Sequence, residues 1–142
     1  MTHEEEVSWA WATALFDAEG TMGLVSKPPQ IRLMLGMVDE DIVQRFVEIV
    51  GVGNVKWSFP PSRRNRNKQP MYYWSVTARD SVTHVMNHLL PLLGQRRTAR
   101  YLELQAQATP RMLLCAACRR HRCRFGHLIC GRCHASIGWA VA

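Results

Sequence analysis

One segment near the N-terminus constrains the fold of this chain more than any other: residues 9–20, WAWATALFDAEG. Ala10, Ala14 and Ala18 recur at every fourth position, so on a helix they form a narrow stripe that another backbone can approach closely. Tryptophan, leucine and phenylalanine side chains cover most of the remaining circumference, which is the pattern of a buried helix. The segment therefore predicts a buried helix with a helix-packing face.

The same helix is predicted to end in two carboxylates, Asp17 and Glu19, followed by Gly20. Glycine is common just past the C-terminus of a helix. The helix dipole is negative at that end and disfavours anions, so the two acids need a nearby cation. The alternative interpretation is a core helix with solvated acids at its tip.

Residues 12–20, ATALFDAEG, resemble the LAGLIDADG motif of the homing endonucleases. Leu15, Asp17, Ala18 and Gly20 match as they stand, and Glu19 replaces one acid by another. In that family the motif helices of two half-domains pack together, and the last acid of each motif binds divalent metal over the DNA. The resemblance implies that Glu19 is a catalytic metal ligand and that the Ala18 carbonyl is a further ligand.

The chain departs from the motif at its first three positions, which are Ala12, Thr13 and Ala14. Threonine is small enough for a close-packed helix interface, where we expect Thr13 to lie. The glutamate at position 19 is one methylene longer than the usual aspartate, which changes the expected metal geometry.

Charge is distributed very unevenly along the 142 residues, whose net charge is +7 and whose pI is about 9.6. Residues 1–48 contain nine of the eleven acids and three of the eighteen Lys and Arg residues, which leaves fifteen bases for the rest. This division favours a polyanionic partner. The acidic start and the lack of a long apolar run predict a soluble, intracellular protein, cytoplasmic in a bacterial or phage-infected cell.

The pattern after residue 20 predicts two hairpins, each followed by a helix. Strands are expected at 21–27 and 31–38, then at 54–59 and 71–78; helices are expected from 39 to 50, from 80 to 90 and from 95 to 107. This order, αββαββα, is that of a LAGLIDADG half-domain. We therefore expect an α+β fold for residues 1–108, in which helices cover one face of a curved antiparallel sheet and leave the other free.

A two-stranded ribbon fits the major groove of DNA, so the free face is expected to bind DNA. Alternation along the strands assigns polar side chains to it, and the basic loop of the second hairpin is expected to follow the phosphates. The expected DNA-binding residues are Lys27, Gln30, Arg32, Lys56, Ser58, Arg63, Arg64, Arg66 and Lys68. A basic loop that is simply solvated is the alternative.

The motif occurs once, which predicts a homodimer with Ala10, Ala14, Ala18 and Trp11 in its interface. A two-fold dimer reads a quasi-palindromic site. Phosphodiester hydrolysis with carboxylate ligands favours Mg²⁺. The resemblance further implies Arg96 and Arg97 as basic active-site residues and Asp39 as a residue that positions water. Asp39 fits the role of helix cap equally well.

Residues 109–142 are predicted to form a separate module that binds structural Zn²⁺. Cys115-x2-Cys118 and Cys130-x2-Cys133 have the spacing of a tetrahedral zinc site. Cys123, His121, His127 and His134 are further candidate ligands, and free thiols are the alternative.

Together these features predict a site-specific homing endonuclease that hydrolyses a long, quasi-palindromic double-stranded DNA target with divalent metal. Two alternatives on the same fold are a DNA-binding regulator that does not cleave and an RNA maturase.

Overall fold

The computed structural model describes residues 1–58, 69–108, 116–120, 123 and 129–136. The chain forms two compact units, Met1–Ala108 and Thr109–Ala142. They are called here the core unit and the cysteine-rich unit.

The core unit begins with helix α1 (His3–Glu19), whose N-terminus is closed by a capping box. The Thr2 hydroxyl accepts a hydrogen bond from the Glu5 backbone N–H at 3.3 Å, and the Glu5 carboxylate accepts one from the Thr2 N–H at 2.7 Å. The bond from the Thr2 backbone lowers the pKa of Glu5. These reciprocal bonds satisfy donors that a helix leaves unpaired at its start.

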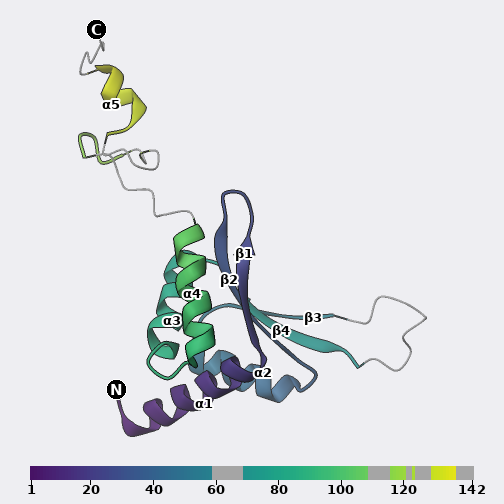
Figure 1. Ribbon diagram of the computed structural model, residues 1–142. Helices are drawn as coiled ribbons and strands as arrows, with labels where there is room; N and C mark the ends of the chain where they lie inside the picture. Colours follow the sequence, from purple (N-terminus) through teal and green to yellow (C-terminus); the bar gives the residue numbers. More distant parts are fainter. Residues whose placement is uncertain (59–68, 109–115, 121–122, 124–128, 137–142) are drawn as a thin grey trace. The chain divides into compact units, whose positions relative to one another are not determined.

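Four strands form one antiparallel sheet in the spatial order β1-β2-β4-β3. They are β1 (Gly20–Val25), β2 (Gln30–Met37), β3 (Asn54–Ser58) and β4 (Met71–Val76). Helix α2 (Glu40–Val50) separates the two hairpins, and α3 (Arg79–Leu89) and α4 (Gln95–Gln107) follow the sheet. The predicted order of helices and strands is confirmed (Figure 1). A short helix, α5 (Gly131–Ser136), belongs to the cysteine-rich unit.

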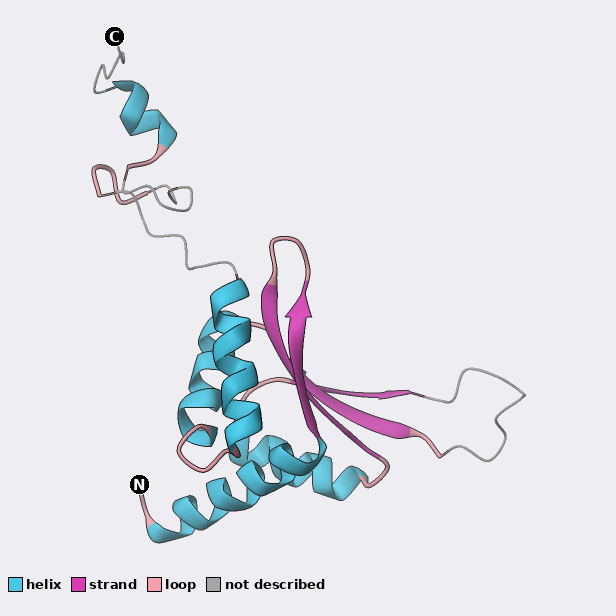
Figure 2. Cartoon of the chain, viewed as in Figure 1, coloured by secondary structure: helices cyan, strands magenta, loops and turns pink. Residues whose placement is uncertain are grey.

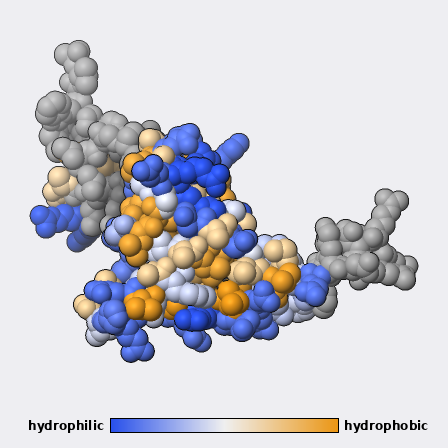
Figure 3. Space-filling model, turned by 60° about the horizontal axis from the view of Figure 1, so that its bottom comes forward, coloured by the Kyte–Doolittle hydropathy of each residue, from blue (hydrophilic) through white to orange (hydrophobic). Residues whose placement is uncertain are grey.

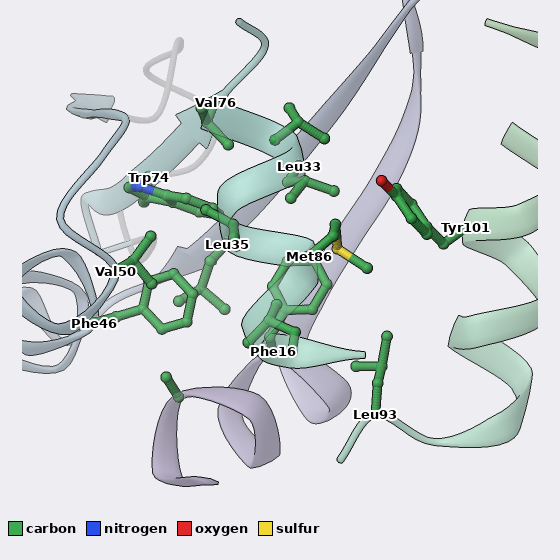
Figure 4. Close-up of a cluster of buried hydrophobic side chains, with 14 of the residues drawn as sticks. Phe16, Leu33, Leu35, Phe46, Val50, Trp74, Val76, Met86, Leu93 and Tyr101 are labelled. Carbon is green, nitrogen blue, oxygen red and sulfur yellow. The ribbon is translucent and has the colours of Figure 1, made fainter. Parts of the chain in front are cut away.

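The helices of the core unit gather on one side of the sheet and leave the opposite face open (Figure 2). Side chains from the two layers meet in a buried core, in which Leu35 and Trp74 of the sheet contact Phe16, Phe46 and Met86 of the helices (Figure 4). The rings of Phe46 and Trp74 meet edge to face at 4.9 Å. None of the helices among the described residues has the length and apolar character needed to cross a membrane.

Two residues of the motif segment have roles other than those expected. Thr13 is only 2% exposed, and its hydroxyl donates to the Trp9 carbonyl at 2.7 Å; it faces the protomer's own core, so its expected place in a helix interface is wrong. Gly20 is extended, with φ of −71° and ψ of 154°, rather than left-handed. Glycine is needed there because a Cβ would collide with the ring and the carbonyl of Phe16.

Gly20→Ala is expected to lower the free energy of unfolding by about 1–3 kcal/mol, because the added methyl group overpacks the contact with Phe16. Gly23 lies in the same strand with open space where its Cβ would be, so Gly23→Ala is the matched control, with a change within about 0.5 kcal/mol. Urea unfolding followed by tryptophan fluorescence measures both variants. Equal stability of the two would contradict the steric explanation.

Candidate active site and nucleic-acid interface

The C-terminus of α1 presents an exposed carboxylate at the edge of the sheet. Helix α1 ends at Glu19 and the edge strand β1 starts at the next residue, so no loop separates them. Ala18 and Glu19 are both exposed. The last carbonyls of a helix have no intrahelical partner, so this end combines a free carboxylate with backbone carbonyl oxygens. Oxygen donors of this kind suit a hard divalent cation such as Mg²⁺.

Arg97 of α4 holds this end of α1 in place. Its Nε donates to the Asp17 carbonyl at 2.8 Å, and its Nη1 donates to the Gly20 carbonyl. The Nε also lies 3.6 Å from the Asp17 carboxylate, and the Arg97 side chain is only 17% exposed. The two hydrogen bonds bracket Ala18 and Glu19, and the positive charge lies where the helix dipole is negative. Arg97 is thus a cation beside Asp17, one of the two acids at the end of the helix.

The start of α4 packs against the same turn. Gly94 precedes α4, and a Cβ at this position would lie 2.8 Å from Oδ2 and 3.1 Å from Oδ1 of Asp17. The glycine therefore lets the Asp17 carboxylate lie against the beginning of α4. This contact and the Arg97 hydrogen bonds together anchor the residue that precedes Ala18 and Glu19.

A basic hollow of about 340 Å³ lies beside the start of β1, lined by Thr21, Met22, Arg96, Arg97 and Arg100. Arg96 and Arg100 are exposed, one helical turn apart. Arg100 also pairs with Glu103 at 2.8 Å, but both side chains are about half exposed, and such pairs contribute little. Both expected basic residues, Arg96 and Arg97, thus line this hollow. Arg96 is exposed, whereas most of the Arg97 side chain is buried. The sequence analysis missed Arg100. Its spacing of four residues from Arg96 could have indicated that the two side chains lie on the same face of the helix.

Asp39 lies at the end of the sheet where α1 joins β1, because Gly20 pairs with Leu35 and β2 ends two residues later. It is exposed at the N-cap position of α2, and its side chain makes no capping hydrogen bond. The cap position is therefore confirmed without the bond that a capping aspartate usually makes. Nearby, burial and then the negative charge of Glu40 raise the pKa of Tyr72.

The free face of the sheet carries the polar residues that alternation assigned to it. Strand pairing places Gln30, Arg32, Lys56 and Ser58 on the face opposite the buried Leu33, Leu35, Trp74 and Val76. All four are exposed, as is Lys27 in the turn between β1 and β2. Arg63, Arg64, Arg66 and Lys68 lie outside the described residues.

Tyr73 is a residue of this face that the sequence analysis missed. It pairs with Gly36 of β2, and a Cβ on Gly36 would lie 2.6 Å from Tyr73 Cε1, so the tyrosine ring covers the glycine. The alternation of Tyr73 with the buried Trp74 was the signal that could have found it. The face therefore carries an aromatic ring among its polar side chains.

An apolar stripe runs along the outer side of α1. Ala10, Ala14 and Ala18 are exposed, and Val7 is 56% exposed. Figure 3 shows this underside of the molecule, where apolar surface lies among hydrophilic residues. Trp11 at the margin is half-buried, with the Arg45 guanidinium 4.3 Å from the centre of its ring. The structure therefore leaves the predicted packing stripe uncovered within one protomer.

Three of the four expected zinc ligands cluster in the cysteine-rich unit. The sulfur atoms of Cys118, Cys130 and Cys133 all lie within 4.8 Å of one another. Cys123 is buried beside them but is not part of this group. The other candidates, Cys115, His121, His127 and the side chain of His134, lie outside the described part of the chain.

No protein-family model and no curated protein matches the sequence. Solved structures match it at low identity. The homing endonuclease I-CvuI, in complex with its target in the presence of calcium, gives a TM-score of 0.57 with 23% identity over 73% of this chain and 68% of that one. The archaeal intron-encoded homing endonuclease I-Vdi141I, complexed with DNA, gives a TM-score of 0.55 with 11% identity over 72% of this chain and 67% of that one. The LAGLIDADG meganuclease I-CpaMI, bound to uncleaved DNA, gives a TM-score of 0.53 with 15% identity over 70% of this chain and 36% of that one.

This is the LAGLIDADG homing-endonuclease fold. The predicted α+β half-domain is confirmed, with its four-stranded antiparallel sheet and its helices on one face. At these identities the likeness concerns the fold, and the LAGLIDADG-like segment at residues 12–20 is the C-terminal part of α1 with the first residue of β1.

Arg97→Gln is expected to lower the free energy of unfolding by about 2 kcal/mol, because the Asp17 and Gly20 carbonyls lose a charged donor that is largely shielded from water. Arg96→Gln removes the same charge from an exposed position and is expected to change stability by no more than about 0.5 kcal/mol. Urea denaturation of the two variants measures the difference. If both unfold at the wild-type urea concentration, Arg97 does not anchor α1.

Proposed function

We propose that this protein is a site-specific DNA endonuclease of the homing type that acts as a homodimer. The position of Glu19 carries the proposal. Glu19 is an exposed carboxylate at the end of α1, the helix that carries the exposed alanine stripe. This end of α1 lies at the edge of the sheet, whose free face is polar. A carboxylate beside DNA phosphates repels them unless it binds a cation. Its presence therefore favours metal-dependent cleavage over binding alone.

The small side chains at Ala10, Ala14 and Ala18 support a two-fold dimer. Small residues at every fourth position let two helices approach closely, and a two-fold axis brings the same stripe of each protomer together. Ala18 belongs to the stripe and Glu19 follows it, so pairing the stripes brings the two glutamates toward the axis. The dimer then holds one carboxylate for each strand of the duplex.

Mg²⁺ is the proposed cofactor, held by the Glu19 carboxylate and the Ala18 carbonyl. When bound, it supplies an activated water and stabilises charge on the phosphate and the leaving oxygen. The chain's own residues prepare this position. Arg97 bonds to the two carbonyls that flank Ala18 and Glu19, so the backbone that carries the carboxylate is positioned before DNA arrives.

Arg96 and Arg100 are proposed to bind a backbone phosphate in the basic hollow. Guanidinium groups form charge-assisted hydrogen bonds with phosphate oxygens, and here two of them face the same hollow beside β1. Their charge also stabilises negative charge that develops on a phosphate during hydrolysis. Arg97 has a positioning role in this scheme, because its donors already bind the end of α1.

The free face of the sheet is proposed to read the major groove. Gln30, Arg32, Lys56 and Ser58 lie on one face, where side chains that donate and accept hydrogen bonds can meet base edges. A two-fold dimer doubles this surface and implies a quasi-palindromic target.

Glu19→Gln is expected to abolish cutting, with a loss of about 100-fold or more, while DNA binding is kept. The assay incubates the full-length protein with a randomised duplex library in magnesium, with calcium as the parallel condition, and sequences the ends. Glu48→Gln, which removes an exposed carboxylate from α2, is the matched control and is expected to cut as the wild type does.

The proposal of a nuclease would be supported by DNA ends that form only with magnesium and Glu19 and that map to one quasi-palindromic sequence. A library that is bound and never cut would overturn it in favour of a DNA-binding regulator. Preference for structured RNA over duplex DNA would favour the maturase.

Ala14→Glu is expected to convert the dimer into a monomer, because it places a charge at the centre of a stripe that must pack against its own copy. Ala99→Glu introduces the same side chain at an exposed position of α4 and is expected to leave the dimer intact. Sedimentation velocity of the two variants and the wild type measures the mass in solution. A wild-type monomer at all concentrations would contradict the dimer.

A further inference from the structure

The cysteine-rich unit has almost no apolar core among its described residues. Cys123 and Cys130 are its buried core residues, and the partly buried side chains packed against them are Cys118, Ile129 and Cys133. The unit comprises residues 109–142, and chains shorter than about 40 residues usually need disulfides, metals or oligomerisation to fold. Among the described residues of this unit, the buried side chains are thus thiols rather than large apolar groups.

The distance between the thiols distinguishes a disulfide from a metal site. The Cys118 and Cys130 sulfur atoms lie 3.9 Å apart, so no disulfide bond joins them. A disulfide bond is only about 2.05 Å long. In a tetrahedral zinc site with Zn–S bonds of about 2.3 Å, neighbouring sulfur atoms lie about 3.8 Å apart. The observed separation matches the edge of that tetrahedron.

A third thiol lies beside this pair of sulfur atoms. Cys133 lies within 4.8 Å of both other sulfur atoms and comes from the first turn of α5, three residues after Cys130. Two segments separated by about ten residues of chain thus converge on one point with three sulfur atoms. Soft thiolate ligands in this arrangement select zinc over magnesium or calcium.

The charge of the segment also suits a thiolate site. Residues 109–142 contain six arginines and no acidic residue. Arg119, Arg120 and Arg132 are described and exposed, and each is within two residues of a cysteine of the cluster. The positive charge of these arginines offsets the negative charge that thiolate ligands bring to a metal site.

We propose that Cys118, Cys130 and Cys133 bind one structural Zn²⁺ ion. The ion would join the two described segments of the cysteine-rich unit that carry these thiols. Cys123, which is buried beside the cluster and outside the sulfur group, packs against the site without binding the ion. The site is separate from the proposed Mg²⁺ position at Glu19, which has oxygen ligands only.

The test measures zinc in the full-length protein, purified in buffer containing zinc and then freed of unbound metal. Mass spectrometry of the metal content is expected to give one zinc per chain and no iron. Cys118→Ser, Cys130→Ser and Cys133→Ser are each expected to lose the ion. Cys123→Ser is the matched control, since it removes a buried thiol of the same unit and is expected to retain one zinc per chain. No step of this experiment requires DNA or cleavage.

Two further readouts keep the result interpretable. Urea unfolding of the core unit is followed by its tryptophans, with Trp139 of the cysteine-rich unit replaced by phenylalanine in every protein compared. It is expected to be unchanged in every cysteine variant, which separates loss of the ion from loss of the whole fold. Replacement of zinc by cobalt(II) is expected to give the absorption of a tetrahedral thiolate site. Wild-type protein without metal, iron in place of zinc, a disulfide between Cys118 and Cys130, or stoichiometric zinc in Cys118→Ser would each overturn the proposal.

Discussion

The direct junction of helix α1 and strand β1 is the constraint on which the rest of the core unit depends. Glu19 is the last residue of the helix and Gly20 the first of the strand. The helix position is fixed by Phe16 in the core, and the strand position by its pairing with β2. Since no loop separates the two elements, the direction of the Glu19 backbone is determined from both sides. Arg97 adds a third restraint by bonding to the carbonyls on either side.

Much of the fold could be predicted from the sequence because it depends on local patterns of apolar and polar residues. The expected range of α4, residues 95–107, coincides with the observed Gln95–Gln107, because Gly94 and the preceding Pro91 separate two patterns of helical period. The polar side chains of the free face were found by alternation, since each strand has one face against the helices. These features depend on local periodicity, which a sequence displays directly.

The roles of individual residues at the site were harder to predict because they depend on contacts between distant segments. Arg97 lies eighty residues from Asp17 in sequence, and nothing near Arg97 shows that its donors bind the α1 carbonyls. Thr13 departs from the motif and was expected in a helix interface. Its hydroxyl instead donates a hydrogen bond to the Trp9 carbonyl within the same helix, so threonine is tolerated in the core. Gly20 was predicted as a glycine that ends a helix. Glycine is needed there because the ring of Phe16 leaves no room for a side chain.

The contact between Gly94 and Asp17 links the identities of two positions that are far apart in the chain. A side chain at position 94 would meet the carboxyl group at position 17 and displace it, so glycine at 94 favours the observed position of the Asp17 carboxylate. Shortening the residue at 17 would open space at 94, and an alanine there would then fit. Within a lineage of such proteins, the two positions should drift as a pair, and a change at one should permit a change at the other that it would otherwise forbid.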